Sequence, residues 1–274
     1  MSELNGIMVA LITPFNDDRT KIDEGRLQAH IEHLIKAGVH GLVPGGSTGE
    51  FTVLSTAERK QLTELCLKFA AGRVPVVVGT GSTSSAEAIE LSAHAGQAGA
   101  ASVMVVPPFY DPVDLEQLHE LLAEIHAVSK LPIMYYNIPG ASGLTLSPRN
   151  LPAFPSLNDK ITAFNGWDSL TFYGLAAGCP GGVWGAANFI PELAVELYEA
   201  VSVKGDLKRG RELWTKAFPI CKFLESHNYC GAVKTGVELI GQPTGGLRKP
   251  FSLLKPELQA ELKQLLQNAG VKTI

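Results

Sequence analysis

The segment from Gly45 to Glu50, written GGSTGE, has a composition that suits the binding of a small anion. Its glycines let the backbone approach a ligand closely, and the hydroxyls of Ser47 and Thr48 can join free backbone N–H groups in holding a carboxylate. The segment is not a phosphate-binding P-loop, because no Gly-Lys-Ser or Gly-Lys-Thr follows. The pattern alone predicts either a carboxylate-binding loop or a plain loop that leads into a helix cap.

Tyrosines in two later segments could move protons. Tyr110 lies in PPFYDP, while Tyr135 and Tyr136 are adjacent in YYNIPGASG. Neighbouring residues of a strand point to opposite faces, so only one of Tyr135 and Tyr136 can serve a site inside the fold. Taken singly, each of these aromatics is more often a packing residue than a catalytic one.

Composition argues against several other classes of protein. The formal net charge is −4 and no Lys/Arg cluster occurs, so we expect no nucleic-acid partner. Cys66, Cys179, Cys221 and Cys230 lack metal-ligand spacing, which predicts reduced thiols in a cytoplasmic protein, with no metal and no cofactor. Residues 170–190 carry no charge, but their five glycines and one proline argue against a membrane span. The N-terminal residues do not read as a signal peptide.

Short apolar runs that alternate with amphipathic segments predict the scaffold for these residues. The runs are continuously hydrophobic, which is typical of a parallel sheet with helices on both faces. Over the first half of the chain they begin about 30 residues apart, the spacing of βα units in an eightfold barrel. The seven runs are residues 6–15, 39–45, 74–79, 101–107, 132–138, 161–165 and 181–186.

Helix signals lie between the runs. The pairs Ser55/Glu58 and Ser84/Glu87 predict capping boxes. No G-x-G-x-x-G follows the first run, which disfavours a Rossmann fold. From about residue 201 onward the sequence pattern predicts helices and no strands. We therefore expect an α/β protein with a (β/α)8 TIM barrel catalytic domain over residues 1–200 and a helical extension over residues 201–274.

Together the segments LITPF, GGSTGE, PPFYDP, YYNIPGASG and GCPGGVWGAAN resemble the dihydrodipicolinate synthase / N-acetylneuraminate lyase family of class I aldolase-type barrels, over nearly the whole chain. Members bind a 2-oxo acid, usually pyruvate, as a Schiff base on a lysine of the sixth strand. The resemblance implies that Ser47 and Thr48 hold the substrate carboxylate and that Tyr136 relays protons near the Schiff base. Ser47 and Tyr110 would link Tyr136 to solvent, with Tyr110 reaching in from a neighbouring subunit of a homotetramer, a dimer of dimers. The substrate-binding residues it implies are Gly46, Ser47, Thr48, Gly166 and Val183.

The chemistry of such a site has a clear physical basis. An iminium withdraws electrons from the adjacent carbon, so a C–C bond can form or break through an enamine without a metal. The lysine amine must be deprotonated to attack, and a dry barrel mouth favours this by lowering its pKa. A tyrosine at the site can then move the protons.

The lysine that the family requires is missing from the printed sequence. Family members carry it in a strand reading roughly G-I-K-[DE], and their seventh strand ends near N-G-x-D. If residues 161–165 (ITAFN) are the sixth strand, Asn165 replaces the lysine. If they are the seventh, Gly166 and Asp168 match the N-G-x-D turn, and this is the placement we favour.

The favoured placement leaves the sixth strand and its helix absent, as a segment of roughly 20–25 residues between Asn158 and Asp159. The Schiff-base lysine is expected in that segment. Lys160 would lie at the wrong end of its strand to replace it, and Lys234 is expected to serve structure.

The resemblance also limits the substrate. Ala141 stands where dihydrodipicolinate synthases usually have an arginine for the second substrate, which favours the lyase and sugar-acid branches. Trp167 and Trp184 are expected to narrow the pocket, so we prefer a short 4-hydroxy-2-oxo acid or 2-keto-3-deoxy acid. A deaminase or dehydratase of a similar substrate is the alternative within the enzyme class. A non-catalytic metabolite-binding relative is the alternative outside it, if Asn165 truly replaces the lysine.

Overall fold

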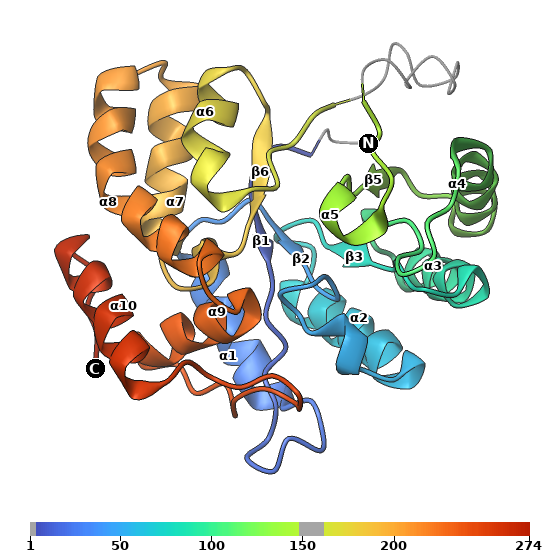
Figure 1. Cartoon of the computed structure of the whole chain (residues 1–274), viewed down its shortest axis with the longest axis horizontal. Coiled ribbons are helices and arrows are strands. Elements are labelled where there is room, and N and C mark those ends of the chain that lie inside the picture. The colour runs from blue at the N-terminus through green and yellow to red at the C-terminus, as the bar shows by residue number, and fades with distance from the viewer. Residues whose placement is uncertain (1–3, 148–161) are drawn as a thin grey trace.

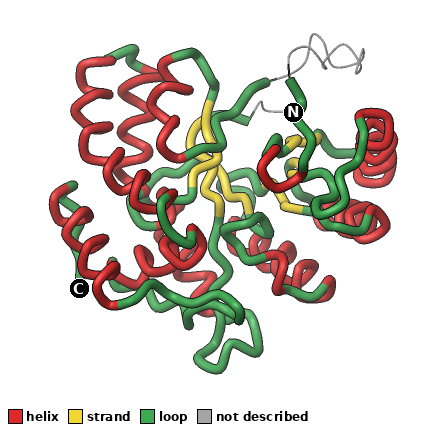
Figure 2. The backbone as a smooth tube through the Cα atoms, in the orientation of Figure 1, coloured by secondary structure: helices red, strands yellow, loops and turns green. Residues whose placement is uncertain are grey.

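Parallel strands lie at the centre of the molecule and helices surround them, as Figure 1 and, by colour of element, Figure 2 show. This computed structural model describes residues 4–147 and 162–274. Within that part, six strands form two parallel sheets in the orders β2-β1-β6 and β3-β4-β5. The strands are β1 (Gly6–Ala10), β2 (Gly41–Val43), β3 (Val77–Gly79), β4 (Ser102–Val105), β5 (Ile133–Tyr135) and β6 (Gly181–Trp184).

Two single bridges connect these sheets into one parallel series. Leu42 of β2 pairs with Val76, immediately before β3, and Asn165 pairs with Gly182 of β6. Among the described residues the order therefore runs from Asn165 through β6, β1, β2, β3 and β4 to β5. All seven predicted runs take part in this order, although residues 162–165 contribute one bridge and not a strand. The α/β class is confirmed, while the described residues alone form an open series and not a closed eight-stranded barrel.

Side chains on the two faces of the strands form two separate clusters. Ile7 and Val9 of β1 pack outward with the helices, whereas Met8 between them packs inward. The inner cluster has buried Met8, Val43, Val77 and Met104, with Leu4, Met134, Tyr136, Phe164 and Val183 packed against it. Residues from all six strands, or immediately beside them, and from the segment before Asn165 thus surround a common interior.

In the described part of the first 200 residues, seven α-helices follow or separate the strands: α1 (Glu24–Lys36), α2 (Thr56–Ala70), α3 (Ser85–Ala98), α4 (Leu115–Ser129), α5 (Pro139–Ser142), α6 (Thr171–Ala176) and α7 (Pro191–Tyr198). Ser55 and Glu58 form the predicted capping box at α2. The second predicted box is only half formed. Ser84 caps α3, but the Glu87 carboxylate accepts hydrogen bonds from the hydroxyls of Ser82 and Thr56 instead.

The C-terminal part is helical, as predicted, with α8 (Leu207–Glu225), α9 (Tyr229–Leu239) and α10 (Pro256–Asn268). The segment between α9 and α10 contacts the loop that follows β1, because the Phe15 N–H donates to the Thr244 carbonyl at 2.8 Å. The uncharged residues 170–190 form α6 and β6. Within the described ranges, no helix has both the length and the apolarity needed to span a bilayer. The division at residue 200 stays a prediction.

Candidate active site

The loop from Gly45 to Glu50 follows β2 and packs tightly against the end of β3. A Cβ built on Gly79 would lie 2.4 Å from the Gly45 carbonyl oxygen, so no side chain fits at that contact. Gly45 has a φ of +72°, which favours glycine. The Thr13 hydroxyl donates to the Gly49 carbonyl at 2.7 Å. The glycines of GGSTGE therefore allow a close approach of two backbones.

A small hollow opens beside this loop at the carboxyl ends of the strands. Gly46 and Ser47 line it together with Gly79, Gly81, Met104 and Tyr136, among others. Three of the predicted site residues, Gly46, Ser47 and Tyr136, thus come together from the segments that follow β2 and β5, which are distant in sequence. Ser47 is exposed and can offer its hydroxyl to a ligand, whereas Thr48 is buried and does not line the hollow.

Tyr136 is the tyrosine that points into the interior. It packs with Met134 against the inner cluster, while Ile133 packs with the outer one. Its backbone N–H donates to the Val105 carbonyl at 2.8 Å, which extends the pairing of β4 and β5. Burial raises the pKa of Tyr136, and the nearby Asp168 carboxylate raises it further. The phenol therefore keeps its proton at neutral pH and can donate it.

Tyr110 does not reach the hollow within one chain. Its side chain is 91% exposed, and it has a left-handed φ of 87° that residues with a Cβ rarely adopt. The preceding Phe109 instead packs edge-on against Phe51, with ring centroids 5.8 Å apart. A role for Tyr110 at the site would require a second subunit, and it stays a prediction.

Asn165 faces away from the interior. Its side-chain amide donates to the Trp167 carbonyl at 2.9 Å and to the Thr171 hydroxyl at 3.1 Å, on the side of α6. The neighbouring Phe164 packs into the inner cluster. Gly166 comes close to the site, since a Cβ built on it would lie 3.9 Å from Cε2 of Tyr136. The placement of residues 161–165 as the seventh strand stays a prediction.

Asp168 is a buried carboxylate that the sequence indicated only as a motif match. It accepts hydrogen bonds from the backbone N–H groups of Gly185 at 3.3 Å and Ala186 at 3.1 Å. The Tyr229 hydroxyl also donates to it. Burial raises the pKa of Asp168 to about 6, against the opposing effect of these hydrogen bonds. The partner Tyr229, from α9, is brought near by tertiary packing, which no local sequence signal indicates.

Val183 and Trp184 point to opposite faces of β6. Val183 packs against the inner cluster. Trp184 is fully buried in the outer layer, with its ring 6.4 Å from that of Trp214. The expectation that Trp184 narrows the pocket is therefore wrong, because adjacent strand residues alternate in direction. Trp167 is 52% exposed.

None of the described residues that line the hollow is a lysine. Lys234 of α9 is fully buried, and its amino group pairs with the Glu50 carboxylate at 2.5 Å. Lys160 and the junction between Asn158 and Asp159 lie outside the described residues. Over residues 4–147 and 162–274, no cluster of His, Cys, Asp and Glu could hold a metal ion.

The sequence matches the model of the Dihydrodipicolinate synthetase family in two stretches, residues 3–157 and residues 150–269. Two curated relatives are named 4-hydroxy-tetrahydrodipicolinate synthase. The protein of Methanopyrus kandleri is 33% identical over 293 aligned positions, which cover 98% of this chain and 97% of the relative. That of Rhizobium meliloti is 34% identical over 292 positions, which cover 97% and 98%.

The alignment with the Methanopyrus kandleri protein contains gaps in this chain. It runs over 293 positions, whereas 98% of the 274-residue chain is about 269 residues, so about 24 aligned positions have no residue in this chain. The two family stretches meet and overlap at residues 150–157. The point where the two stretches meet thus lies beside the predicted junction at Asn158.

Solved structures of the family resemble this chain over nearly all of its length. YagE, a prophage protein of the dihydrodipicolinic acid synthase family from E. coli K12, was solved in complex with pyruvate. It has a TM-score of 0.91 and 30% identity, covering 99% of this chain and 100% of its own. A putative dihydrodipicolinate synthetase from Pseudomonas aeruginosa has a TM-score of 0.92 and 30% identity, covering 97% and 100%.

Proposed function

Because the chain belongs to the dihydrodipicolinate synthetase family, we propose that it is a pyruvate- or 2-oxo-acid-dependent lyase or synthase. The family is one of lyase-class enzymes, and its curated relatives are named as synthases. In this proposal a C–C bond forms or breaks through an imine between the substrate carbonyl carbon and a lysine amine.

The observation that carries the proposal is the shared hollow of Ser47 and Tyr136. It lies at the carboxyl ends of parallel strands, where barrel enzymes place their active sites. The exposed Ser47 hydroxyl suits a carboxylate, and the buried Tyr136 phenol suits proton transfer to a neighbouring carbonyl oxygen. The pyruvate complex of YagE supports a 2-oxo acid as the ligand.

We place the lysine in a sixth strand that lies between β5 and residues 162–165 and closes an eight-stranded barrel. The described parallel order ends at β5 on one side and at Asn165 on the other. The relative has about 24 positions that this chain lacks, close to the ~30 residues of one βα unit. A closed barrel leaves no unpaired sheet edges, whereas an omitted strand exposes two.

In this mechanism the deprotonated lysine amine attacks the 2-oxo carbon, and the carbonyl oxygen leaves as water after taking up protons. Tyr136 relays to the oxygen one proton from the attacking nitrogen and one from solvent, which leaves the protonated imine. Loss of a proton or breaking of a C–C bond at the adjacent carbon then gives the enamine, and Tyr136 returns a proton to that carbon. Ser47 and Thr48 hold the carboxylate, Gly46, Gly166 and Val183 complete the substrate site, and Ser47 with Tyr110 connects Tyr136 to solvent.

The substrate that we propose is a short 4-hydroxy-2-oxo acid or 2-keto-3-deoxy acid. Ala141 lies in α5, where dihydrodipicolinate synthases usually have an arginine, so a second anionic substrate lacks its partner there. Trp184 faces the outer layer and so does not limit the length of the substrate. A deaminase or dehydratase in the same family fits the same residues. We further propose a cytoplasmic homotetramer in which Tyr110 crosses between subunits.

A second candidate function is a non-catalytic 2-oxo-acid-binding protein. The observation that favours it is that the described residues around the hollow include no lysine. Borohydride reduction in the presence of pyruvate separates the two functions, because only an imine is converted into a stable adduct. A trapped adduct supports the lyase or synthase, whereas calorimetric binding of pyruvate without an adduct supports the binding protein. Absence of both binding and adduct contradicts both functions.

A further inference from the structure

Helix α9 holds the loop that carries Ser47 and Thr48 at two points. The Cys230 thiol donates to the Ser47 carbonyl oxygen at 2.9 Å. Lys234, four residues later, pairs with the Glu50 carboxylate at 2.5 Å. Residues four apart lie on the same face of a helix. One face of α9 therefore contacts the middle and the end of the loop.

The backbone conformation of Glu50 is unfavourable for a residue with a long side chain. Its φ of 58° is left-handed, a region that favours glycine or asparagine and is unfavourable for other residues. Its side chain is nevertheless completely buried. One carboxylate oxygen contacts Lys234, and the other accepts a hydrogen bond from the Arg248 backbone N–H at 3.1 Å. A turn alone would not require a carboxylate here, so the carboxylate has a role of its own.

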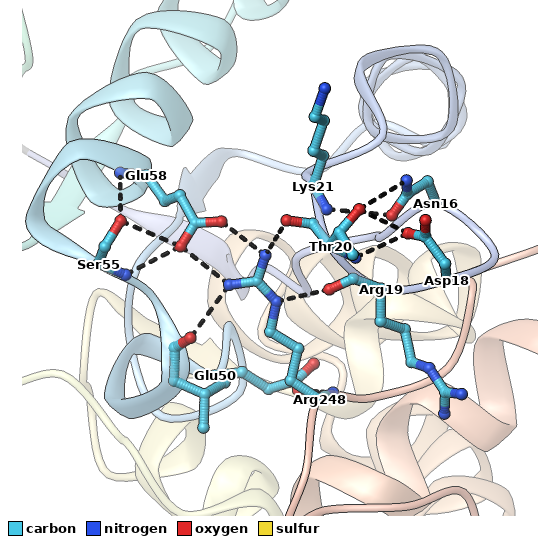
Figure 3. Close-up of polar contacts among 10 residues, drawn as sticks. Asn16, Asp18, Arg19, Thr20, Lys21, Glu50, Ser55, Glu58 and Arg248 are labelled. Atoms are coloured by element: carbon cyan, nitrogen blue, oxygen red, sulfur yellow. Dashed lines mark hydrogen bonds and ion pairs between the residues drawn. The ribbon is translucent and has the colours of Figure 1, made fainter.

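The groups that hold Glu50 are themselves fixed. The Lys234 amino group donates to the Gly246 carbonyl at 2.7 Å and lies 4.2 Å from the centre of the Phe15 ring. Figure 3 shows the Arg248 guanidinium between Glu58 and the loop that carries Arg19 and Thr20. It donates to both Glu58 oxygens, at 2.6 and 2.9 Å, and to the carbonyls of Arg19 and Thr20, each at 2.8 Å. Both Glu50 oxygens thus have anchored partners.

Stability by itself does not explain a pair of fully buried charges. Removing both charges from water costs free energy, and replacing such a pair by apolar side chains is often neutral or stabilising. An ion pair does impose a fixed direction on both partners, which apolar contacts do not. Here the ion pair fixes the orientation of Glu50, the last residue of the GGSTGE loop.

We propose that Lys234 and Glu50 are positioning residues, whose ion pair, together with Cys230, sets the loop conformation in which Ser47 and Thr48 meet a substrate carboxylate. The identity of that ligand rests on the proposed function, whereas the control of loop conformation does not. Neither residue needs to touch the ligand, since both act through the backbone of residues 47–50.

The test compares variants by amide hydrogen exchange of a peptide covering residues 45–51 and by pyruvate titration. The amides of Gly49 and Glu50 are bonded within the loop, so they report its opening directly. The main variant combines Lys234→Met with Glu50→Gln, which removes both charges and leaves neither unpaired. We expect cooperative unfolding to persist, loop exchange to become at least tenfold faster, and the pyruvate dissociation constant to rise at least tenfold.

Two matched sets of variants serve as controls. Lys204→Met removes an exposed partner of Glu199, at 3.2 Å, and should leave loop exchange and affinity unchanged. Cys230→Ser keeps a donor to the Ser47 carbonyl and should resemble the unaltered protein, whereas Cys230→Ala should speed loop exchange severalfold.

A folded double variant with unchanged loop exchange would overturn the proposal. If the double variant does not fold, the cysteine variants decide, and equal loop exchange in Cys230→Ala and Cys230→Ser would overturn it. If the unaltered protein does not bind pyruvate, the proposed function fails while the exchange rates still decide the positioning role.

Discussion

Asn165 pairs in parallel with Gly182 of β6, and its side chain turns toward α6 while the neighbouring Phe164 fills the interior. A lysine that forms an imine in a barrel must point inward, into the hollow. Asn165 points the other way, so it does not stand in the place of that lysine. This orientation supports our proposal that the residues around Asn165 correspond to the seventh strand of the family and that the sixth has no counterpart in the printed sequence.

Replacing Tyr136 by phenylalanine should slow proton transfer about 10²–10³-fold, within the range for loss of an acid–base group. The exchange of pyruvate methyl protons with deuterated solvent, followed by NMR, measures this step without knowledge of the second substrate. Tyr135→Phe is the matched control, because β5 directs Tyr135 to the opposite face. Equal rates in the two variants would remove Tyr136 from the mechanism.

Ser47→Ala should weaken pyruvate binding by about 1–3 kcal/mol, the scale of a hydrogen bond to a charged group, and Thr48→Val should weaken it to a similar extent by removing support for the loop. Ser47 is exposed beside the hollow, whereas Thr48 is buried, so the two variants test direct contact and enclosed support separately. Titration calorimetry measures both. Unchanged affinity in Ser47→Ala would show that the loop does not hold the carboxylate through that hydroxyl.

The sequence predicted features that depend on local pattern. The parallel strands, the Ser55/Glu58 capping box and the helical C-terminal part all follow from hydrophobic runs and short-range hydrogen bonds. The sequence did not predict features that depend on contacts between residues distant in sequence. Trp184 packs outward because of its place in β6. The Glu87 carboxylate bonds the hydroxyl of Thr56, which tertiary packing brings near, and does not complete its capping box. The burial of Asp168, with Tyr229 as a partner, is another such feature.

Asp168 should make the protein less stable as pH rises from about 4 to about 6. Its carboxyl binds a proton more tightly in the fold, with a pKa of about 6, than in the unfolded chain, where it is about 3.9. The stabilising contribution is complete below the unfolded value and is lost through the folded one, for a total of about 3 kcal/mol. Urea unfolding of Asp168→Asn should lack this part of the pH dependence, and an identical slope in both proteins would contradict the prediction.

Tyr110 should become buried when the protein associates. Its side chain is 91% exposed in one chain, and its strained backbone presents the ring to solvent. We expect light scattering to give the mass of a homotetramer, and Tyr110→Ala to slow the proton exchange of pyruvate. A stable monomer with full exchange activity would remove Tyr110 from the site.

The most direct test of a lysine imine in a missing sixth strand is the intact mass of the protein before and after borohydride reduction with pyruvate. We expect a mass above 29.2 kDa by roughly 2–3 kDa, the size of one short βα unit. Reduction should then add a single pyruvyl group, on a lysine between Asn158 and Asp159. A mass of 29.2 kDa with no adduct would contradict this, and the hollow beside Ser47 and Tyr136 would then have no lysine to form the imine.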